Sequence, residues 1–365
     1  MENKQKIAEV KGIAFPNRGA ELLLMACLEQ LISRKYLIAT EPYSPYHYKV
    51  AYPLYTKTRI DRFGINLIYP FSLLPKYIRE RLGLVKGSEL SLILDASGYA
   101  YGDPWPVSLA KQRLLNEKLS CPKIMLPQSF GPFTSRKNID IAKRLADKCS
   151  LIYAREEEGA SNFEKVTGRQ ISVIPDITFL LSSDTGQACR DIVIVPNFQV
   201  YKRNGDLYLD CLKKVIKELV NNRRMVTILN HEGEKDRKIS SEIIEGMGVI
   251  GSQVEYLEPS SGNEAKGIIS TAKFILTSRY HALISALASA VPCMALGWSF
   301  KYEEALKNFD IDSANLIGSP EKIVEIIESE SYCQQFGSNS YVRKRTEIEN
   351  KVSGMWQEIF TLIDS

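Results

Sequence analysis

Short apolar runs alternate with amphipathic segments along most of the chain. The first run, residues 12–15, is followed by a loop at 16–19 and an amphipathic stretch at 20–31. Short buried strands separated by helices predict a parallel sheet. The later runs stand at residues 91–94, 123–126, 151–154 and 171–174, with helical segments near 136–148 and 156–166.

A second series of the same kind begins after a small and polar stretch. Residues 182–187 read SSDTGQ, and a new apolar run at 191–195 follows them. We therefore predict two doubly wound α/β domains, residues 1–185 and 186–340, that face each other across a cleft. The final helical pattern, within residues 341–365, is long enough to cross back to the first domain.

The segment from Thr277 to Lys301 carries the strongest signal for a binding site. It reads as a strand, a helix and a second strand, at residues 274–276, 282–290 and 293–296. If the two strands are parallel, both carboxyl ends open on the edge where ligands of open α/β sheets bind. The charged residues of the segment would then share that edge.

Three charged residues of this segment indicate a binding site for a small, doubly charged anion. Arg279 and His281 come at a helix N-terminus, which favours an anion, and Lys301 follows the second strand. His281 could also pass a proton. The structural alternatives are a hydrogen-bonding role for His281 and solvated surface positions for Arg279 and Lys301. Trp298 either packs the wall of this binding site or contacts the substrate.

The first domain offers weaker candidates. Arg155 follows the apolar run 151–154, so it too stands at the carboxyl end of a predicted strand. We expect it to bind substrate, and the alternative is an ion pair with one of the three glutamates that follow it. Asn17 and Arg18, ahead of Gly19, occupy a phosphate-type loop position but lack a glycine-rich nucleotide motif.

Polar side chains end two further strands of this domain. Asp95 and Ser97 follow one strand and Gln128 ends another, which makes them candidates for contact with substrate. A turn explains Asp95 and Ser97 equally well, because both are turn-forming residue types. Asp176 is either a helix cap or a carboxylate in the cleft.

Composition excludes several classes of function. The chain has 47 basic and 43 acidic residues, a net charge of +4, without a basic run or an aromatic-interleaved basic stripe, which argues against nucleic acid as a partner. The N-terminal residues lack the apolar core of a secretory signal. No window offers the run of about 18 apolar residues that a spanning helix needs, so we expect a cytoplasmic protein.

Cysteine and histidine usage points away from disulfides and from a histidine-rich metal centre. The seven cysteines are scattered and show no C-x-x-C pair, which indicates reduced thiols. The three histidines lie far apart in sequence, so we expect no metal site built on them. A carboxylate-bound Mg²⁺ stays compatible with the sequence.

Taken together, several short motifs resemble those of the polysaccharide pyruvyl transferase family. The C-terminal motifs are Ser278-Arg279-Tyr280-His281, Gly297-Trp298-Ser299 and Lys301-Tyr302-Glu303. Looser N-terminal matches are Asn17-Arg18-Gly19-Ala20-Glu21, Asp95-Ala96-Ser97-Gly98, Leu126-Pro127-Gln128-Ser129-Phe130-Gly131-Pro132, Ala154-Arg155-Glu156 and Ile174-Pro175-Asp176. The resemblance spans about residues 12–305.

The resemblance implies a fold and a reaction. The fold would be two Rossmann-like domains in a GT-B-like arrangement, and the reaction would move pyruvate from phosphoenolpyruvate onto a sugar diol as a ketal. Arg155, His281 and Lys301 would hold the donor, and the lysine stands 20 residues after the histidine, as the family pattern implies. Arg279 could share the phosphate. We expect no cofactor beyond the donor substrate.

The chemistry of the donor agrees with these residue types. Phosphoenolpyruvate carries a carboxylate and a phosphate, which suit several cations at a helix N-terminus. We expect His281 to protonate the enol methylene, and Asp95 and Asp176 are the candidate bases for the sugar hydroxyls. The acceptor would be a surface polysaccharide or its polyprenyl-diphosphate-linked precursor. A lipid-linked acceptor would bring the protein to the inner face of the membrane.

Two other functions stay open at this point. A glycosyltransferase of the same shape would bind a nucleotide diphosphate at the helix start that carries Arg279, because fold does not fix function. A non-catalytic component of a polysaccharide assembly complex would release no phosphate with any sugar.

Overall fold

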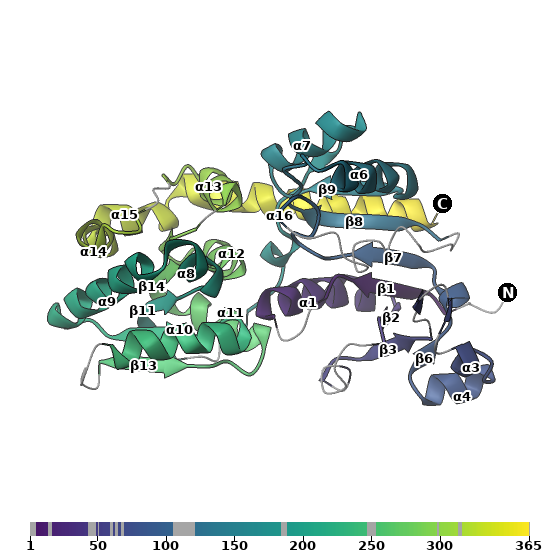
Figure 1. The fold of residues 1–365 in the computed structure, drawn as a ribbon, viewed down its shortest axis with the longest axis horizontal. Coiled ribbons are helices and arrows are strands. Elements are labelled where there is room, and N and C mark those ends of the chain that lie inside the picture. The colour runs from purple at the N-terminus through teal and green to yellow at the C-terminus, as the bar shows by residue number, and fades with distance from the viewer. Residues whose placement is uncertain are drawn as a thin grey trace. The chain divides into compact units, whose positions relative to one another are not determined.

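The first half of the chain folds into an eight-stranded parallel sheet, seen in the computed structural model of the protein (Figure 1). The structure describes residues 5–13, 17–42, 49, 51–58, 61–62, 65–66, 69–104, 121–183, 188–246, 253–297, 299–312 and 316–364. The strands lie in the order β10 (Ser172–Val173), β9 (Leu151–Ala154), β8 (Lys123–Gln128), β7 (Leu92–Asp95), β1 (Ile7–Lys11), β2 (Leu37–Thr40), β3 (Leu54–Lys57) and β6 (Leu84–Val85).

The first strand is not where the apolar pattern predicted it. We expected a strand at residues 12–15, of which 14 and 15 lie outside the described residues; β1 covers Ile7–Lys11, and Gly12 follows it with a positive φ of 83°. The charged residues Glu9 and Lys11 interrupt the apolar pattern of β1, so the sequence does not read as a buried strand. Glu9 is fully buried and lies 2.7 Å from the Nζ of Lys57 on β3, so its charge is compensated inside the sheet.

Helices cover this sheet, and one apolar cluster joins two of them to it. Ile141 and Leu145 on α6 and Phe163 on α7 pack with Met125 and Ile152 of the strands. The N-cap Ser135 starts α6 by accepting a hydrogen bond from the backbone N–H of Asn138. The helical segments of this half are α1 (Arg18–Ser33), α3 (Tyr69–Ser72), α4 (Lys76–Arg81), the 3₁₀ turn η1 (Gly87–Glu89), α6 (Arg136–Lys148), α7 (Glu157–Thr167) and the 3₁₀ turn η2 (Ile177–Phe179). A two-stranded ribbon pairs β4 (Asp61–Arg62) with β5 (Ile65–Asn66).

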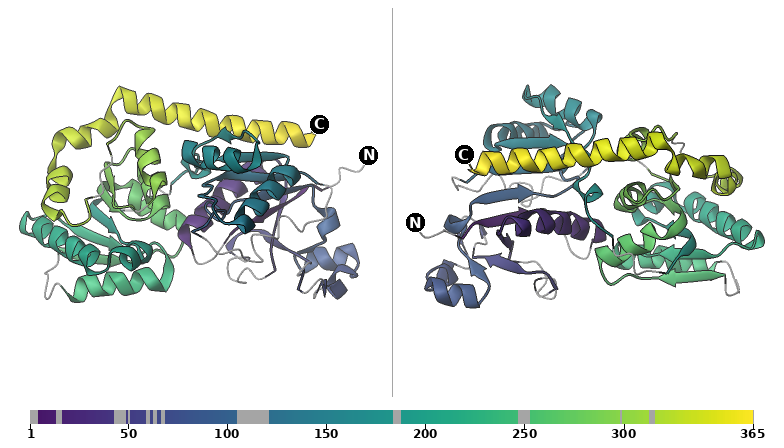
Figure 2. Two further views of the ribbon diagram at one scale, coloured as in Figure 1. Left: turned by 45° about the horizontal axis from the view of Figure 1, so that its top comes forward. Right: turned by 180° about the vertical axis from the view of Figure 1, so that it is seen from behind.

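The second half folds into a five-stranded parallel sheet. Its strands lie in the order β13 (Val254–Leu257), β12 (Val226–Leu229), β11 (Arg190–Val195), β14 (Ala272–Thr277) and β15 (Cys293–Ala295). Its helical segments are α8 (Phe198–Asn204), α9 (Asp206–Asn221), α10 (Gly233–Glu245), α11 (Gly262–Ser270), α12 (Tyr280–Ala288), α13 (Phe300–Lys307), α14 (Pro320–Glu328), α15 (Glu330–Gln334), the 3₁₀ turn η3 (Gln335–Gly337) and α16 (Asn339–Asp364). Figure 2 shows α16 as one continuous helix.

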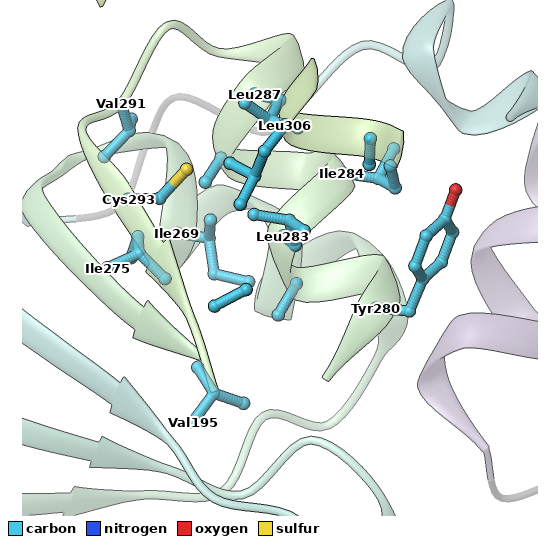
Figure 3. Packing of buried hydrophobic residues seen from close by; sticks show 14 of the residues in the cluster. Val195, Ile269, Ile275, Tyr280, Leu283, Ile284, Leu287, Val291, Cys293 and Leu306 are labelled. Carbon is cyan, nitrogen blue, oxygen red and sulfur yellow. The ribbon is translucent and has the colours of Figure 1, made fainter. Parts of the chain in front are cut away.

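Alternate residues of the second sheet enter two apolar clusters, one on each face. Val195 and Ile275 pack against Leu283 and Leu287 of α12, whereas Ile194 and Leu276 belong to the cluster that includes α9 and α14. In Figure 3 the ring of Tyr280 lies at the edge of the first cluster, with its hydroxyl pointing away from Leu283. The N-terminal end of α12 is thereby placed at the rim of the core.

The chain divides into two compact units. Unit 1 contains the described residues within 1–15, 23–177 and 351–365, and unit 2 those within 16–22 and 178–350. The sequence led us to expect the division at residues 185 and 186, and it falls between Ile177 and Thr178. The first turn of α1 therefore belongs to unit 2, and the end of α16 belongs to unit 1. No helix in the described part of the chain is both long and apolar enough to cross a bilayer.

Candidate functional site

In unit 2, the strand order reverses between β11 and β14. From β11 the chain moves outward through β12 to β13, and it then returns to place β14 on the other side of β11. The loops that leave these two neighbouring strands run in opposite directions. Ligands of open α/β sheets bind at such a point, at the carboxyl ends of the strands. Asn197 follows β11 there, and Ser278 and Arg279 follow β14.

Buried hydrogen bonds fix the turn after β14. Asn197 Nδ2 donates to the carbonyl of Ser278 at 2.8 Å, and the Tyr208 hydroxyl donates to Ser278 Oγ at 2.8 Å. The Tyr302 hydroxyl donates to the same carbonyl at 2.9 Å. Burial raises the pKa of Tyr208, so this hydroxyl keeps its proton. The turn that leads to His281 is therefore held from three sides.

Arg279 pairs with two carboxylates that the sequence analysis did not identify. Its Nε lies 2.8 Å from Oδ2 of Asp236, which is fully buried in the first turn of α10. Its NH1 contacts Glu232, which is 31% exposed. An anion that reached Arg279 would compete with Glu232 more easily than with Asp236, because only Glu232 can turn into water.

The first turn of α1 is anchored to this network. Asn17 Oδ1 accepts hydrogen bonds from the backbone N–H groups of Gly19 at 2.9 Å and Ala20 at 3.2 Å, as a helix cap does. Asn17 Nδ2 donates to Glu232 at 2.7 Å. Arg18 donates to the carbonyl of Pro259 at 2.7 Å. The side chains of Asn17 and Arg18, which we expected to bind substrate, thus make structural contacts within unit 2.

His281 lies against the backbone of Gly19. A Cβ at position 19 would come 2.2 Å from Nδ1 of His281, so a glycine is required for the two to approach this closely. The rings of His281 and Tyr280 meet edge to face, with centroids 5.6 Å apart. His281 is only partly buried, in the first turn of α12. The side chain is held in place and is partly exposed, and its Nε2 atom is buried.

Lys301 lies near Tyr280, whose ring also contacts His281. It stands in the first turn of α13, and its Nζ is 5.0 Å from the ring centre of Tyr280 and 5.5 Å from that of Tyr302. An ammonium group is attracted to aromatic faces at such distances. The structure thus brings Arg279, His281 and Lys301 together, as their placement in the sequence suggested. Trp298 lies outside the described residues.

A second histidine belongs to the same edge. His231 follows β12 and is 2% exposed, and its Nε2 has no hydrogen-bond partner among the described residues. Burial lowers the pKa of His231 well below its usual range, and the charges of Arg279, His281 and Arg18 lower it further. A neutral imidazole therefore lies close to the cationic groups of the site.

In unit 1, Arg155 is buried among partners. Its Nε lies 2.9 Å from Glu156, its NH1 2.9 Å from Asp176, and its NH2 donates to Ser129 Oγ at 2.8 Å. The side chain is 2% exposed. The ion pair that the sequence left as the alternative is therefore present, with Asp176 as a further partner. The donor-binding role of Arg155 stays a prediction, as does the role of Asp176 as a base.

The other unit 1 candidates are also held in place. Oδ1 of Asp95 accepts from the backbone N–H of Ser97 at 2.9 Å and also contacts its hydroxyl, while Oδ2 accepts from Tyr101 at 2.6 Å. This is the turn arrangement that the sequence left as the alternative, and the role of Asp95 as a base stays a prediction. Gln128 is fully buried, and its amide makes no hydrogen bond within the described residues.

The match to a family model decides the relationship of the chain. The model named polysaccharide pyruvyl transferase matches residues 17–299, which include Arg155, His231 and His281. The chain belongs to the polysaccharide pyruvyl transferase family. No curated protein matches the chain in sequence.

The solved structures that this chain resembles share its fold. Anabaena HepE in complex with UDP-glucose has a TM-score of 0.61 at 13% identity, with 97% of this chain and 99% of that chain covered. The Staphylococcus aureus MnaA–UDP structure has a TM-score of 0.59 at 14% identity, with 92% of each chain covered. The UDP-GlcNAc 2-epimerase of Neisseria meningitidis, bound to UDP-GlcNAc, has a TM-score of 0.58 at 12% identity, with 98% of this chain and 100% of that chain covered. These likenesses show a GT-B-like fold of two Rossmann-like domains.

Several residues at this edge of the unit 2 sheet were not predicted from the sequence. His231 and Glu232 follow β12 and Asp236 lies early in α10, and none of the three was among the expected site residues. Their position after an apolar run was the available signal, since the same rule led us to Arg279. Within the described residues, no group of three or more His, Cys, Asp or Glu side chains is gathered as a metal ion would need.

Proposed function

We propose that the protein transfers the pyruvyl group of phosphoenolpyruvate onto two hydroxyls of a saccharide, with formation of a ketal and release of phosphate. The family assignment supports transfer of a pyruvyl group to a polysaccharide. The observation that carries the proposal further is the gathering of Arg279, His281 and Lys301 at the carboxyl edge of the unit 2 sheet.

The charges of this edge suit the donor. Phosphoenolpyruvate presents a carboxylate and a phosphate on neighbouring atoms. Lys301 supplies one positive charge, Arg279 a second, and the first turn of α12 adds backbone N–H groups that favour an anion. In our proposal the donor displaces Glu232 from Arg279, because Glu232 is the more exposed of its two partners. Asp236 keeps the guanidinium in place.

His281 is the proposed proton donor. A proton from its imidazolium adds to the methylene carbon of the donor, which becomes a methyl group and leaves positive charge on the adjacent carbon. The negative charges of a bound donor favour the imidazolium form. General acid catalysis of this kind contributes about 10²–10⁴ in rate. Gly19 and Tyr280 hold the ring in position for this step.

The two acceptor hydroxyls then lose their protons in turn. The first hydroxyl attacks the cationic carbon, and its proton returns to the imidazole of His281. The second hydroxyl displaces phosphate, and its proton leaves with the phosphate as HPO₄²⁻. One proton is gained by the methyl group and one by phosphate, so the balance closes. This scheme needs no base from Asp95 or Asp176, whose oxygens are held by Tyr101, Ser97 and Arg155.

We propose a surface polysaccharide or its polyprenyl-diphosphate-linked precursor as the acceptor, with unit 1 as the acceptor side. This follows from the family, whose substrates are polysaccharides. A lipid-linked acceptor would place the reaction at the cytoplasmic face of the membrane.

The test is an incubation of the protein with phosphoenolpyruvate and a panel of lipid-linked and synthetic galactosides, mannosides and hexosaminides. We expect phosphate release together with the mass of a pyruvate ketal on one acceptor. The variant Lys301→Ala in the same panel is the control for the donor site. If phosphoenolpyruvate leaves the thermal unfolding temperature unchanged and a nucleotide sugar raises it, the protein is a glycosyltransferase instead. Absence of phosphate release with every acceptor would favour a non-catalytic role.

A further inference from the structure

Large exposed apolar side chains are concentrated in one segment of unit 1. Ten large hydrophobic residues are exposed in the described part of the chain, and five of them fall within residues 69–82. The five are Tyr69 at 56%, Phe71 at 51%, Leu73 at 65%, Tyr77 at 66% and Leu82 at 58% exposure. We call them the α3–α4 patch. Single exposed hydrophobic residues are ordinary, whereas several exposed apolar residues gathered in one short segment are a feature of interaction surfaces.

The α3–α4 patch is part of an ordered structure. Arg79 is 3% exposed, and its NH1 donates to the carbonyl of Leu74, between α3 and α4, at 2.9 Å. Its NH2 pairs with Glu89, which also accepts from the backbone N–H of Lys86 at 2.7 Å. The arginine thus ties the segment to η1. The exposed side chains project from a braced support, so their exposure does not come from a loose chain. Figure 1 shows α3 and α4 beside β6, the edge strand of the unit 1 sheet.

Basic side chains stand among the apolar ones. Lys76 and Arg81 are exposed on α4, and Lys86 follows in the next turn. Tyr77 and Arg81 are four residues apart on the same helix, so they share a face. The exposed acid of α4 is Glu80, 3.7 Å from Lys76. Glu89 is already paired with Arg79, so three basic groups stand against one acidic group.

We propose that the α3–α4 patch docks onto the surface of an anionic lipid bilayer. Tyrosine, phenylalanine and leucine next to lysine and arginine are the composition of segments that lie in the membrane interface. A tyrosine ring places its apolar body among the lipid chains and its hydroxyl among the headgroups. The basic groups are attracted by the negative surface potential of such a bilayer. They would repel an identical patch on a second copy of the chain.

This inference is independent of the proposed reaction, because vesicle binding is measured without substrate. The full chain is sedimented with vesicles of phosphatidylcholine, with and without phosphatidylglycerol. We expect binding to the anionic vesicles that weakens as salt is raised, since salt screens exposed charges. The variant Lys76→Glu/Arg81→Glu should lose at least about 25-fold in affinity, from about fivefold for each basic residue. Phe71→Ser/Leu73→Ser/Tyr77→Ser should also lose binding.

Matched variants elsewhere control for charge and exposed hydrophobicity. Lys143→Glu/Arg144→Glu makes the same charge change on the exposed side of α6, and Leu207→Ser removes an apolar side chain that is 57% exposed in unit 2. Both should bind as the wild type does, and circular dichroism should show that all variants are folded. The proposal is wrong if the wild type does not bind anionic vesicles. It is also wrong if the two patch variants bind these vesicles as tightly as the wild type does. A wild-type dimer that the serine variant converts to a monomer would assign the patch to a second copy.

Discussion

The two units each place an arginine after a buried strand, and the two arginines lie in different surroundings. Arg155 in unit 1 is 2% exposed and has two carboxylates and a hydroxyl around its guanidinium. Arg279 in unit 2 is 13% exposed, and one of its two carboxylates is Glu232, which reaches water. Arg155 is surrounded by buried partners, whereas Arg279 has in Glu232 a partner that a ligand could replace.

The neighbours of the two arginines differ in the same way. Around Arg155 the nearby carboxylates of Asp176 and Glu156 are buried. Next to Arg279, His281 and Lys301 stand in the first turns of two helices and are partly exposed. The same position in the strand pattern therefore carries a fully buried ion pair in one unit and an ion pair with a more exposed partner in the other. Exposure of the partners makes the difference.

The largest effect on stability is expected from Arg155→Met. The change leaves the carboxylates of Asp176 and Glu156 buried without their guanidinium, which costs about 3–5 kcal/mol. Urea unfolding would measure the loss. The control is Arg136→Met, on the exposed surface of α6, which should change the unfolding free energy by less than about 0.5 kcal/mol. An Arg155→Met protein as stable as the wild type would show that the buried ion pairs do not stabilise unit 1.

Gly19→Ala should separate catalysis from stability. The added Cβ would overlap Nδ1 of His281, so the imidazole must shift from its present position. A displacement of about 1 Å costs about 10²-fold in rate, so kcat should fall while the unfolding free energy changes little. In the matched variant Gly354→Ala, on α16, the new methyl group meets no atom within 4 Å. Equal turnover by the two variants would contradict the role of Gly19.

The architecture could be predicted from the sequence because most strands and helices show the apolar pattern typical of their type. The runs at 123–126 and 151–154 lie within β8 and match β9, and the segment around His281 has the strand, helix, strand order that we expected. The miss at β1 came from buried charges. Its Glu9 is compensated by Lys57, which is 48 residues away in sequence, and no local pattern reveals such a pair.

Part of the candidate site could be predicted from the positions of its residues relative to the strands. Arg279, His281 and Lys301 follow strands, so the strand-end rule found them. Whether such a residue already has a buried partner depends on contacts between distant segments. The bond from Arg155 to Asp176, and the approach of Gly19 to His281, are both of this kind.

Lys301→Ala should weaken donor binding with little effect on folding. Loss of one charge-assisted contact to the phosphate or carboxylate costs about 1.5–3 kcal/mol, or roughly tenfold or more in KM for phosphoenolpyruvate. Steady-state kinetics with varied donor concentration would measure it. Lys307→Ala, at the other end of α13, is the control and should leave KM unchanged. An unchanged KM for Lys301→Ala would remove this residue from the donor site.

His231→Gln should change how stability depends on pH. The folded protein keeps His231 neutral because burial lowers its pKa, whereas the unfolded chain takes up a proton below about pH 6.5. The wild type therefore loses stability as the pH falls below that value, by at most about 1.4 kcal/mol per pH unit for this group. Urea unfolding at several pH values should show a shallower slope for His231→Gln. The same slope in both proteins would contradict the assignment.

The central claim, that His281 delivers a proton to the donor, is tested most directly by running the reaction in D₂O. Exchange puts a deuteron on the imidazole, so the ketal methyl group formed by the wild type should carry one deuterium, seen by mass spectrometry. His281→Ala should form product about 10²–10⁴-fold more slowly while remaining folded. An unlabelled methyl group, or near-wild-type turnover by His281→Ala, would contradict the account.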